Sequence, residues 1–115
     1  MNDLRVGRLS FTTGSSLVKG IEPKDKDIVV RCKTQDEALK IASEKGYTDI
    51  NTSMVGDPRF VSIRDGEINY ILIWTDEMFF KMEAFSGALK LLQLKDKAKR
   101  IELSKACLYG TVGWL

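Results

Sequence analysis

Two carboxylates, Asp25 and Asp27, lie two positions apart and open the apolar run of the segment DKDIVV at residues 25–30. Side chains two positions apart point to the same side of a β-strand, so these two charges would lie together at the strand edge. Like charges at that distance repel, and the pKa of one carboxyl group rises unless a cation lies between them. Mg²⁺ (or Mn²⁺) binds one or two protein carboxylates and completes its shell with phosphate oxygens and water. The pair therefore indicates either a metal site or a solvated acidic loop.

A small-residue turn, Gly14-Ser15-Ser16, precedes the two acids in the chain. Glycine and serine let backbone and hydroxyl groups approach a phosphate closely. Lys24 and Lys26 add positive charge next to the acids, where they could contact a phosphate or remain solvated. Turn and lysines together are compatible with a nucleotide site, although each alone also occurs in ordinary loops.

The chain contains no histidine, and this excludes several kinds of active site. A Ser-His-Asp triad and a Cys-His pair are impossible. His-ligated zinc is excluded too, and Cys32 and Cys107 are too few for a four-thiolate zinc site. We expect both to be free thiols without a disulfide partner, as in a reducing cytoplasm. Chemistry at neutral pH would then depend on carboxylates and a hard metal ion.

Length and composition predict one cytoplasmic domain over residues 1–115. The hydrophobic share of 43% and the charged share of 30% are those of an ordinary soluble globular protein. No apolar run reaches the roughly 18 residues of a membrane span, and the N-terminus lacks the pattern of a signal peptide. The net charge of +2 neither requires nor excludes a nucleic-acid partner.

The first half of the chain predicts strands and one helix. Strands are expected at residues 5–13 and 27–32, and a short edge strand at 47–51. The helix between them is expected over 34–46, with Thr34 and Glu37 forming a capping box and Ala38, Ile41 and Ala42 on its core face.

The second half predicts a hairpin and two helices. The hairpin pairs 60–64 with 67–74 around an Asp65-Gly66 turn. One helix starts after Thr75, and its core stripe consists of Met78, Met82, Phe85, Leu89 and Leu92. The other spans 96–108, with Ala98, Ile101 and Leu108 on one face. This order predicts an α+β fold, a mixed sheet covered on one side by helices.

The arrangement of the first half resembles the minimal signature of the polymerase-β-like nucleotidyltransferase superfamily. A strand ends in Gly14-Ser15, nine residues follow at 16–24, and Asp-x-Asp then opens an apolar strand. The second half, through GEIN at 66–69, WTDEMFF at 74–80 and LKDKAKRIELSKACLYG at 94–110, resembles small nucleotidyltransferase-like proteins of bacteriophages. A phage origin would place the protein in the host cytoplasm.

The resemblance implies transfer of a nucleoside monophosphate from a nucleotide triphosphate to a hydroxyl group of an acceptor, such as RNA or a protein. On it, Gly14 and Ser15 contact the triphosphate, and Asp25 and Asp27 hold Mg²⁺. Ser16 and the two lysines, Lys24 and Lys26, would also contact the nucleotide.

A third metal-binding and catalytic acid is expected on a neighbouring strand. Glu67 is the first choice and Asp65 the second, although Asp65 is also explained as a turn residue. The superfamily has an aliphatic residue where this chain has Lys26, whose ammonium group could weaken metal binding.

Several side chains have both a functional and a structural interpretation. Arg64 is a phosphate ligand or a surface residue, and Tyr70 and Trp74 stack a nucleobase or belong to the core. Trp114 is either exposed or packed on the helices. Two other functions are compatible with the sequence: an inactive nucleotidyltransferase-like protein that binds or inhibits a partner, and an interaction domain without a ligand.

Overall fold

Four strands form one mixed sheet in the computed structural model, which describes residues 3–22, 26–44 and 60–110. The strands are β1 (Ser10–Thr13), β2 (Lys26–Arg31), β3 (Val61–Asp65) and β4 (Ile68–Ile73). The helices are the 3-10 helix η1 (Gly14–Leu17) and the α-helices α1 (Gln35–Glu44), α2 (Asp76–Leu92) and α3 (Lys97–Tyr109). The strand order is β1-β2-β4-β3, with β2 and β4 parallel and the two outer pairs antiparallel. The predicted α+β class and mixed sheet are confirmed.

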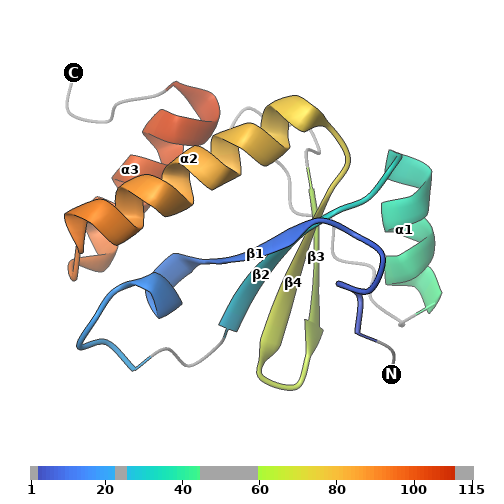
Figure 1. Ribbon diagram of the computed structural model, residues 1–115, viewed down its shortest axis with the longest axis horizontal. Coiled ribbons are helices and arrows are strands. Elements are labelled where there is room, and N and C mark those ends of the chain that lie inside the picture. Colours follow the sequence, from blue (N-terminus) through green and yellow to red (C-terminus); the bar gives the residue numbers. More distant parts are fainter. Residues whose placement is uncertain (1–2, 23–25, 45–59, 111–115) are drawn as a thin grey trace.

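Helices cover both faces of this sheet rather than one. Figure 1 shows α1 on one side and α2 with α3 on the other. Ile28 and Val30 of β2 belong to the core that includes residues of α1, whereas Val29 belongs to the core that includes residues of α2 and α3. Three consecutive buried residues place apolar side chains on both faces of a central strand, so each face needs a cover. Helices α2 and α3 provide the expected cover on one side, and α1 covers the other side, which was not expected.

Most predicted elements match the structure, and the first strand is shorter than expected. β1 begins at Ser10 rather than at residue 5, because the preceding residues form turns in which Gly7 has a φ of +74°. The core face predicted for α1 is confirmed, since Ala38, Ile41 and Ala42 are all buried. The edge strand expected at 47–51 lies outside the described residues.

The β3–β4 hairpin forms as predicted, but its turn is shifted by one residue. Asp65 is the last residue of β3 and pairs with Ile68, so Gly66 and Glu67 make the two-residue connection. Gly66 has a φ of +61°, which suits hairpin turns that have glycine at their first central position. The shift makes Glu67 a turn residue.

Helices α2 and α3, called the outer helices below, bury fewer of their predicted core residues than expected. Met78, Met82 and Leu89 of α2 are buried, but Leu92 is 54% exposed. In α3 only Leu108 of the predicted face is buried, because this helix packs against α2 rather than along the strands. None of the helices described here is long and apolar enough to cross a membrane.

Candidate functional site

Four polar residues form a row across the sheet, one from each strand. Thr13 pairs with Asp27, Asp27 with Asn69, and Asn69 with Arg64. Residues directly opposite each other share a face of the sheet. Thr13 bonds to Ser86 of α2, so the row lies on the face covered by α2 and α3. Asp27 therefore lies on one of the two central strands, near the end of the sheet where β2 and β4 begin.

Asp27 lies between two neighbours that restrain its carboxylate. The side-chain amide of Asn69 donates a hydrogen bond of 3.1 Å to Asp27 Oδ1. On the other side, Gly14 approaches so closely that a Cβ built on it would lie 2.5 Å from Asp27 Oδ2. Gly14 also has a φ of +74°, a conformation that glycine adopts readily. The predicted Gly-Ser turn and the predicted acid therefore lie side by side.

The turn after β1 is fixed in place by helix α2. Ser86 donates its one hydroxyl proton to the Met82 carbonyl oxygen, so Thr13 donates in the buried 2.6 Å bond between Thr13 and Ser86. At the end of α2, Gln93 donates to the carbonyl oxygen of Leu17 and accepts from the backbone N–H of Lys19. These bonds hold η1 at both ends and thereby position Gly14 and Ser15.

A small pocket of about 230 Å³ opens between this turn and the two outer helices. The turn and β2 contribute Gly14, Ser15 and Asp27, and α2 contributes Phe85 and Leu89. Helix α3 contributes Lys97, Arg100 and Ile101. The pocket thus combines one carboxylate, one hydroxyl group and two cations on a partly apolar base.

The two cations reach the pocket because of how α3 begins. Asp96 accepts from the backbone N–H groups of Ala98 and Lys99 and thereby fixes the first turn of the helix. The guanidinium group of Arg100 donates to the carbonyl oxygens of Leu94 and Lys95, which holds it near the helix start. A single ordered turn therefore carries both Lys97 and Arg100.

Of the other residues predicted to contact the nucleotide, the structure describes Ser16 and Lys26, and neither lines this pocket. Ser16 belongs to η1 but does not line the pocket. Lys26 precedes Asp27 in β2, so its exposed side chain points to the opposite face of the sheet. Its ammonium group therefore does not lie beside the Asp27 carboxylate. Asp25 and Lys24 lie outside the described residues.

The two candidates for the third acid differ in their placement. Glu67 is exposed in the hairpin turn, and its carbonyl oxygen accepts a 2.8 Å bond from the Lys26 backbone N–H. It lies at the same end of the sheet as Asp27. Asp65 pairs with Ile68, which packs on the α1 side, so Asp65 faces away from the row. The geometry leaves Glu67 near the site and Asp65 on the other face.

The aromatic residues considered for base stacking belong to the core in the described part of the chain. Tyr70 is 2% exposed and lies in the core under α1, where burial raises the pKa of its hydroxyl group. Trp74 is half-buried and packs against the same core. Trp114 lies outside the described residues.

Sequence reasoning missed three side chains at this site: Asn69, Lys97 and Arg100. Asn69 is a polar residue next to Tyr70 and Ile71 in β4, and only the register between β2 and β4, which the sequence does not reveal, places it opposite Asp27. The lysine and arginine are among seven charged residues at 95–105, a density typical of a solvated helix. Only the packing of α3 over the turn distinguishes these two from their neighbours.

Comparison with known proteins gives no relative for this chain. No protein-family model matches it, and neither the curated proteins nor the solved structures contain a significant match.

Proposed function

We propose that this protein is a Mg²⁺-dependent nucleotidyltransferase whose triphosphate site is the pocket beside Asp27. One observation carries the proposal: Gly14 contacts the Asp27 carboxylate so closely that no side chain fits between them. This contact brings a hydroxyl-bearing turn and a hard-metal ligand together, and Lys97 and Arg100 face them from α3. These groups have the chemistry needed to hold a metal-bound triphosphate.

Each side chain of the pocket has a role in this proposal. Ser15 and the backbone of the turn contact phosphate oxygens, and Lys97 and Arg100 neutralise the charge of the leaving pyrophosphate. Asn69 holds the Asp27 carboxylate in one orientation. At about 230 Å³, the pocket is below the roughly 300–1,000 Å³ of typical small-molecule sites, so it accommodates the phosphates and leaves the nucleoside outside.

The described residues fit a Mg²⁺ ion that relies mainly on its substrate for ligands. No three acidic or thiol side chains gather within the described ranges. Asp27 would supply a carboxylate ligand, and the further acids proposed are Glu67, at the same end of the sheet, and Asp25, which lies outside the described residues. When bound, the ion would neutralise phosphate charge and activate the acceptor hydroxyl.

Asp27→Asn tests the proposal. Mn²⁺ with a nucleotide triphosphate should raise the Tm of the wild type, because a ligand at a hundred times its Kd stabilises the native state by about 2.7 kcal/mol. Asp27→Asn keeps the size of the side chain and removes its charge, so it should lose most of this shift while the unliganded Tm stays similar. Pyrophosphate release in the presence of Mg²⁺ and cell RNA should be lost in parallel.

Two variants serve as controls for Asp27→Asn. Asp65→Asn removes a carboxylate from the opposite face of the same sheet and should leave the shift intact. Lys26→Ile changes the residue beside Asp27, but its side chain points away, so metal binding should be unchanged. If Asp27→Asn retains the wild-type shift, or if it unfolds without ligand, Asp27 has a structural role and the proposal is wrong.

A second function, nucleotide binding without catalysis, is favoured by one observation. The residue directly opposite Asp27 is Asn69, whose side-chain amide donates to the carboxylate and cannot serve as the third carboxylate that catalysis would need. Under this alternative, Mn²⁺ and nucleotide still raise the Tm of the wild type, and Asp27→Asn still removes the shift. Pyrophosphate is not released with any acceptor, and this result separates the two functions.

A further inference from the structure

The other end of the sheet contains a second cavity, which the proposed function does not use. β2 and β4 are adjacent parallel strands, and the chain leaves β2 for α1 on one face and β4 for α2 on the other. Such a divergence creates a crevice at the carboxyl ends of the strands, where α/β sheets commonly bind ligands. The crevice begins at Arg31, four residues along β2 from Asp27, which is about 13 Å at 3.3 Å per residue.

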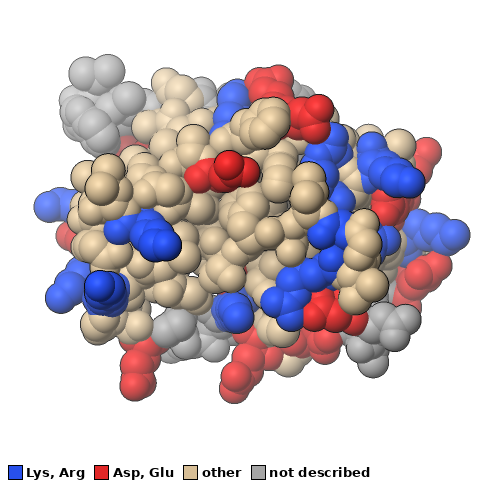
Figure 2. Space-filling view, viewed as in Figure 1, with Lys and Arg blue, Asp and Glu red and all other residues tan. Residues whose placement is uncertain are grey.

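The cavity at this crevice has a volume of about 550 Å³ and three basic residues in its lining. Arg8 comes from the segment before β1, Arg31 from the end of β2, and Lys33 from the connection to α1. In Figure 2, basic side chains gather over the region where β1 begins, with acidic side chains beside them. Glu37 and Asp76 also line the cavity, so its ionisable lining carries three positive and two negative charges.

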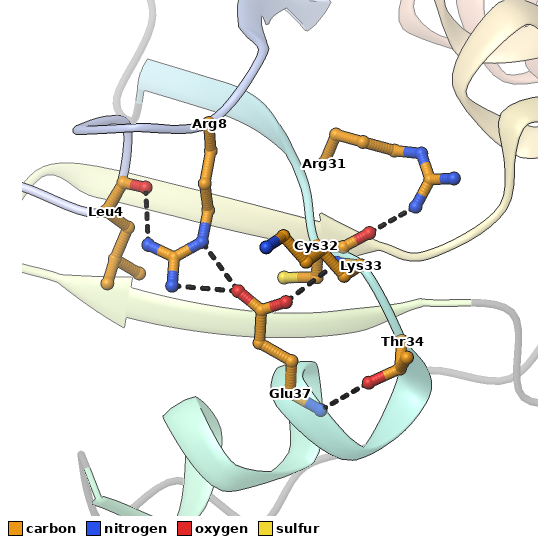
Figure 3. A network of polar contacts seen from close by, with 7 residues as sticks. All are labelled: Leu4, Arg8, Arg31, Cys32, Lys33, Thr34 and Glu37. Atoms are coloured by element: carbon orange, nitrogen blue, oxygen red, sulfur yellow. Dashed lines mark hydrogen bonds and ion pairs between the residues drawn. The ribbon is translucent and has the colours of Figure 1, made fainter.

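Arg8 is held in place by the helix that follows β2, as Figure 3 shows. Its Nε and one terminal nitrogen both lie 2.9 Å from Glu37 Oε1, and its other terminal nitrogen donates to the Leu4 carbonyl oxygen. Glu37 is fixed in turn by accepting from the Lys33 backbone N–H at 2.7 Å. The Arg8–Glu37 pair is therefore a built wall of the cavity.

Arg31 presents a fixed guanidinium group at the cavity. Its side chain is only 20% exposed and donates to the Cys32 carbonyl oxygen, so the guanidinium group is fixed at the cavity. Its acidic partner, Asp76, is 81% exposed and lies 3.0 Å away. An ion pair with such an exposed carboxylate is weak, because water screens it. A dianion in the cavity can replace Asp76 as the partner of Arg31.

The remaining lining favours binding over chemistry. Cys32 also lines the cavity, but its thiol belongs to the core under α1, and burial chiefly raises its pKa to about 11, so it stays protonated near neutral pH. Val6 and Leu9 are 75% and 69% exposed and offer an apolar surface beside the cations. The cavity therefore combines fixed positive charge with a small apolar platform.

We propose that this cavity binds a small molecule through a dianionic phosphate group held by Arg31, Lys33 and Arg8. The bidentate geometry of guanidinium groups suits phosphate oxygens. Lys33 has an exposed side chain that can close over the anion. The site does not depend on the pocket beside Asp27, which lies at the opposite end of the sheet.

Titration with inorganic phosphate in the presence of EDTA tests this site, followed by the chemical shifts of backbone amides. Amides of Arg31, Lys33 and Asp76 should shift with phosphate. Arg31→Gln should weaken binding about tenfold, the loss of a charge-assisted pair of hydrogen bonds. Asp76→Asn should strengthen binding about threefold, because it removes the competing carboxylate. A purely structural role for Arg31 would not produce this opposite effect.

Two further variants locate the bound phosphate. Lys40→Gln removes an exposed cation from α1 outside the cavity and should leave the affinity unchanged. Arg100→Gln alters the pocket beside Asp27 and should leave the phosphate-induced shifts of the Arg31, Lys33 and Asp76 amides unchanged. If phosphate binding is lost in Arg100→Gln and kept in Arg31→Gln, the anion binds at the other pocket and this proposal is wrong. Failure of Asp76→Asn to strengthen binding would also overturn it.

Phenyl phosphate distinguishes the two sources of the phosphate group. A phosphate ester with an apolar body should bind more tightly than inorganic phosphate if its body rests on Val6 and Leu9. Val6→Ser should then reduce the affinity for phenyl phosphate to that for inorganic phosphate. Equal affinities in the wild type identify free phosphate as the ligand.

Discussion

Two separate features of the structure require a glycine at position 14, and we call them the two causes. The backbone has a φ of +74°, which costs an L-residue about 1–2 kcal/mol. The space where a Cβ would lie is occupied by the Asp27 carboxylate. The first cause is common to many turns, but the second links this glycine to the candidate site.

Gly14→Ala and Gly66→Ala should separate these two causes. Gly66 has a similar φ of +61° but no atom near its Cβ position, so its substitution should cost about 1–2 kcal/mol of unfolding free energy. Gly14→Ala must also displace Asp27, which should add about 1–3 kcal/mol. Urea denaturation measures both values. Equal losses for the two variants would mean that the turn relaxes away from Asp27 without strain.

Among the elements, the junction of α2 and α3 controls the turn after β1. Gln93 ends α2 in the left-handed conformation with a φ of +51°, where glycine is the usual residue. Its side chain instead contacts Leu17 and Lys19, in the segment that runs onward from the last residue of η1. A non-glycine residue at this cap is explained by its contacts with that segment.

Gln93→Gly should loosen the turn without weakening the helix end. Glycine suits the left-handed cap and compensates part of the lost hydrogen bonding, so the Tm should change little. The Lys19 amide loses its acceptor, and its hydrogen exchange should become several-fold faster. The Gln93-position amide, which bonds to Leu89, serves as the internal control. Unchanged exchange at Lys19 would show that the turn is held by other contacts.

The start of α1 depends on Glu37 in a way that changes with pH. The pKa of Glu37 is lowered, first by the Lys33 backbone N–H and then by the Arg8 side chain. A carboxyl group with a lowered pKa in the folded state stabilises the fold above its unfolded pKa of about 4.3 and loses this effect as the pH falls further.

Glu37→Gln should therefore destabilise the protein at pH 7 by about 1–2 kcal/mol, the difference between hydrogen bonds to a charged group and hydrogen bonds to a neutral one. The difference from the wild type should shrink as the pH falls below about 4. Urea denaturation at pH 7 and pH 3 measures it. Arg8→Gln should show a smaller effect, because it leaves the Lys33 bond in place. A difference that is constant with pH would contradict this assignment.

Local sequence signals predicted where the helices and strands lie more accurately than how these elements pack against one another. The capping function of Thr34 is confirmed by its 3.1 Å bond from the Glu37 backbone N–H. The reciprocal bond of the expected box goes to Lys33 instead of Thr34, because the Glu37 side chain also binds Arg8. Of the face predicted for α3, only Leu108 is buried, since the orientation of a highly charged helix depends on its neighbours.

Across the whole molecule, the candidate site depends on strand order, which the sequence pattern did not reveal. The Gly-Ser turn and Asp27 were predicted as site residues, and the structure brings them into contact. Asn69 and Arg64 join the same row only because β4 lies between β2 and β3. The pocket beside Asp27 and the cavity at Arg31 lie at opposite ends of β2, the first strand of the parallel pair.

The parallel pairing of β2 with β4 determines when the candidate site can assemble. β1 with β2 and β3 with β4 are neighbours in sequence, whereas Asp27 and Asn69 are 42 positions apart. A hairpin forms within about 1–10 μs, but closing a loop of that length costs about 3 kcal/mol of chain entropy. The Asp27–Asn69 bond joins β2 and β4, the two strands whose pairing needs this long loop to close. A ligand at this site would recognise only the assembled chain, so we expect it to slow unfolding rather than to guide the early steps of folding.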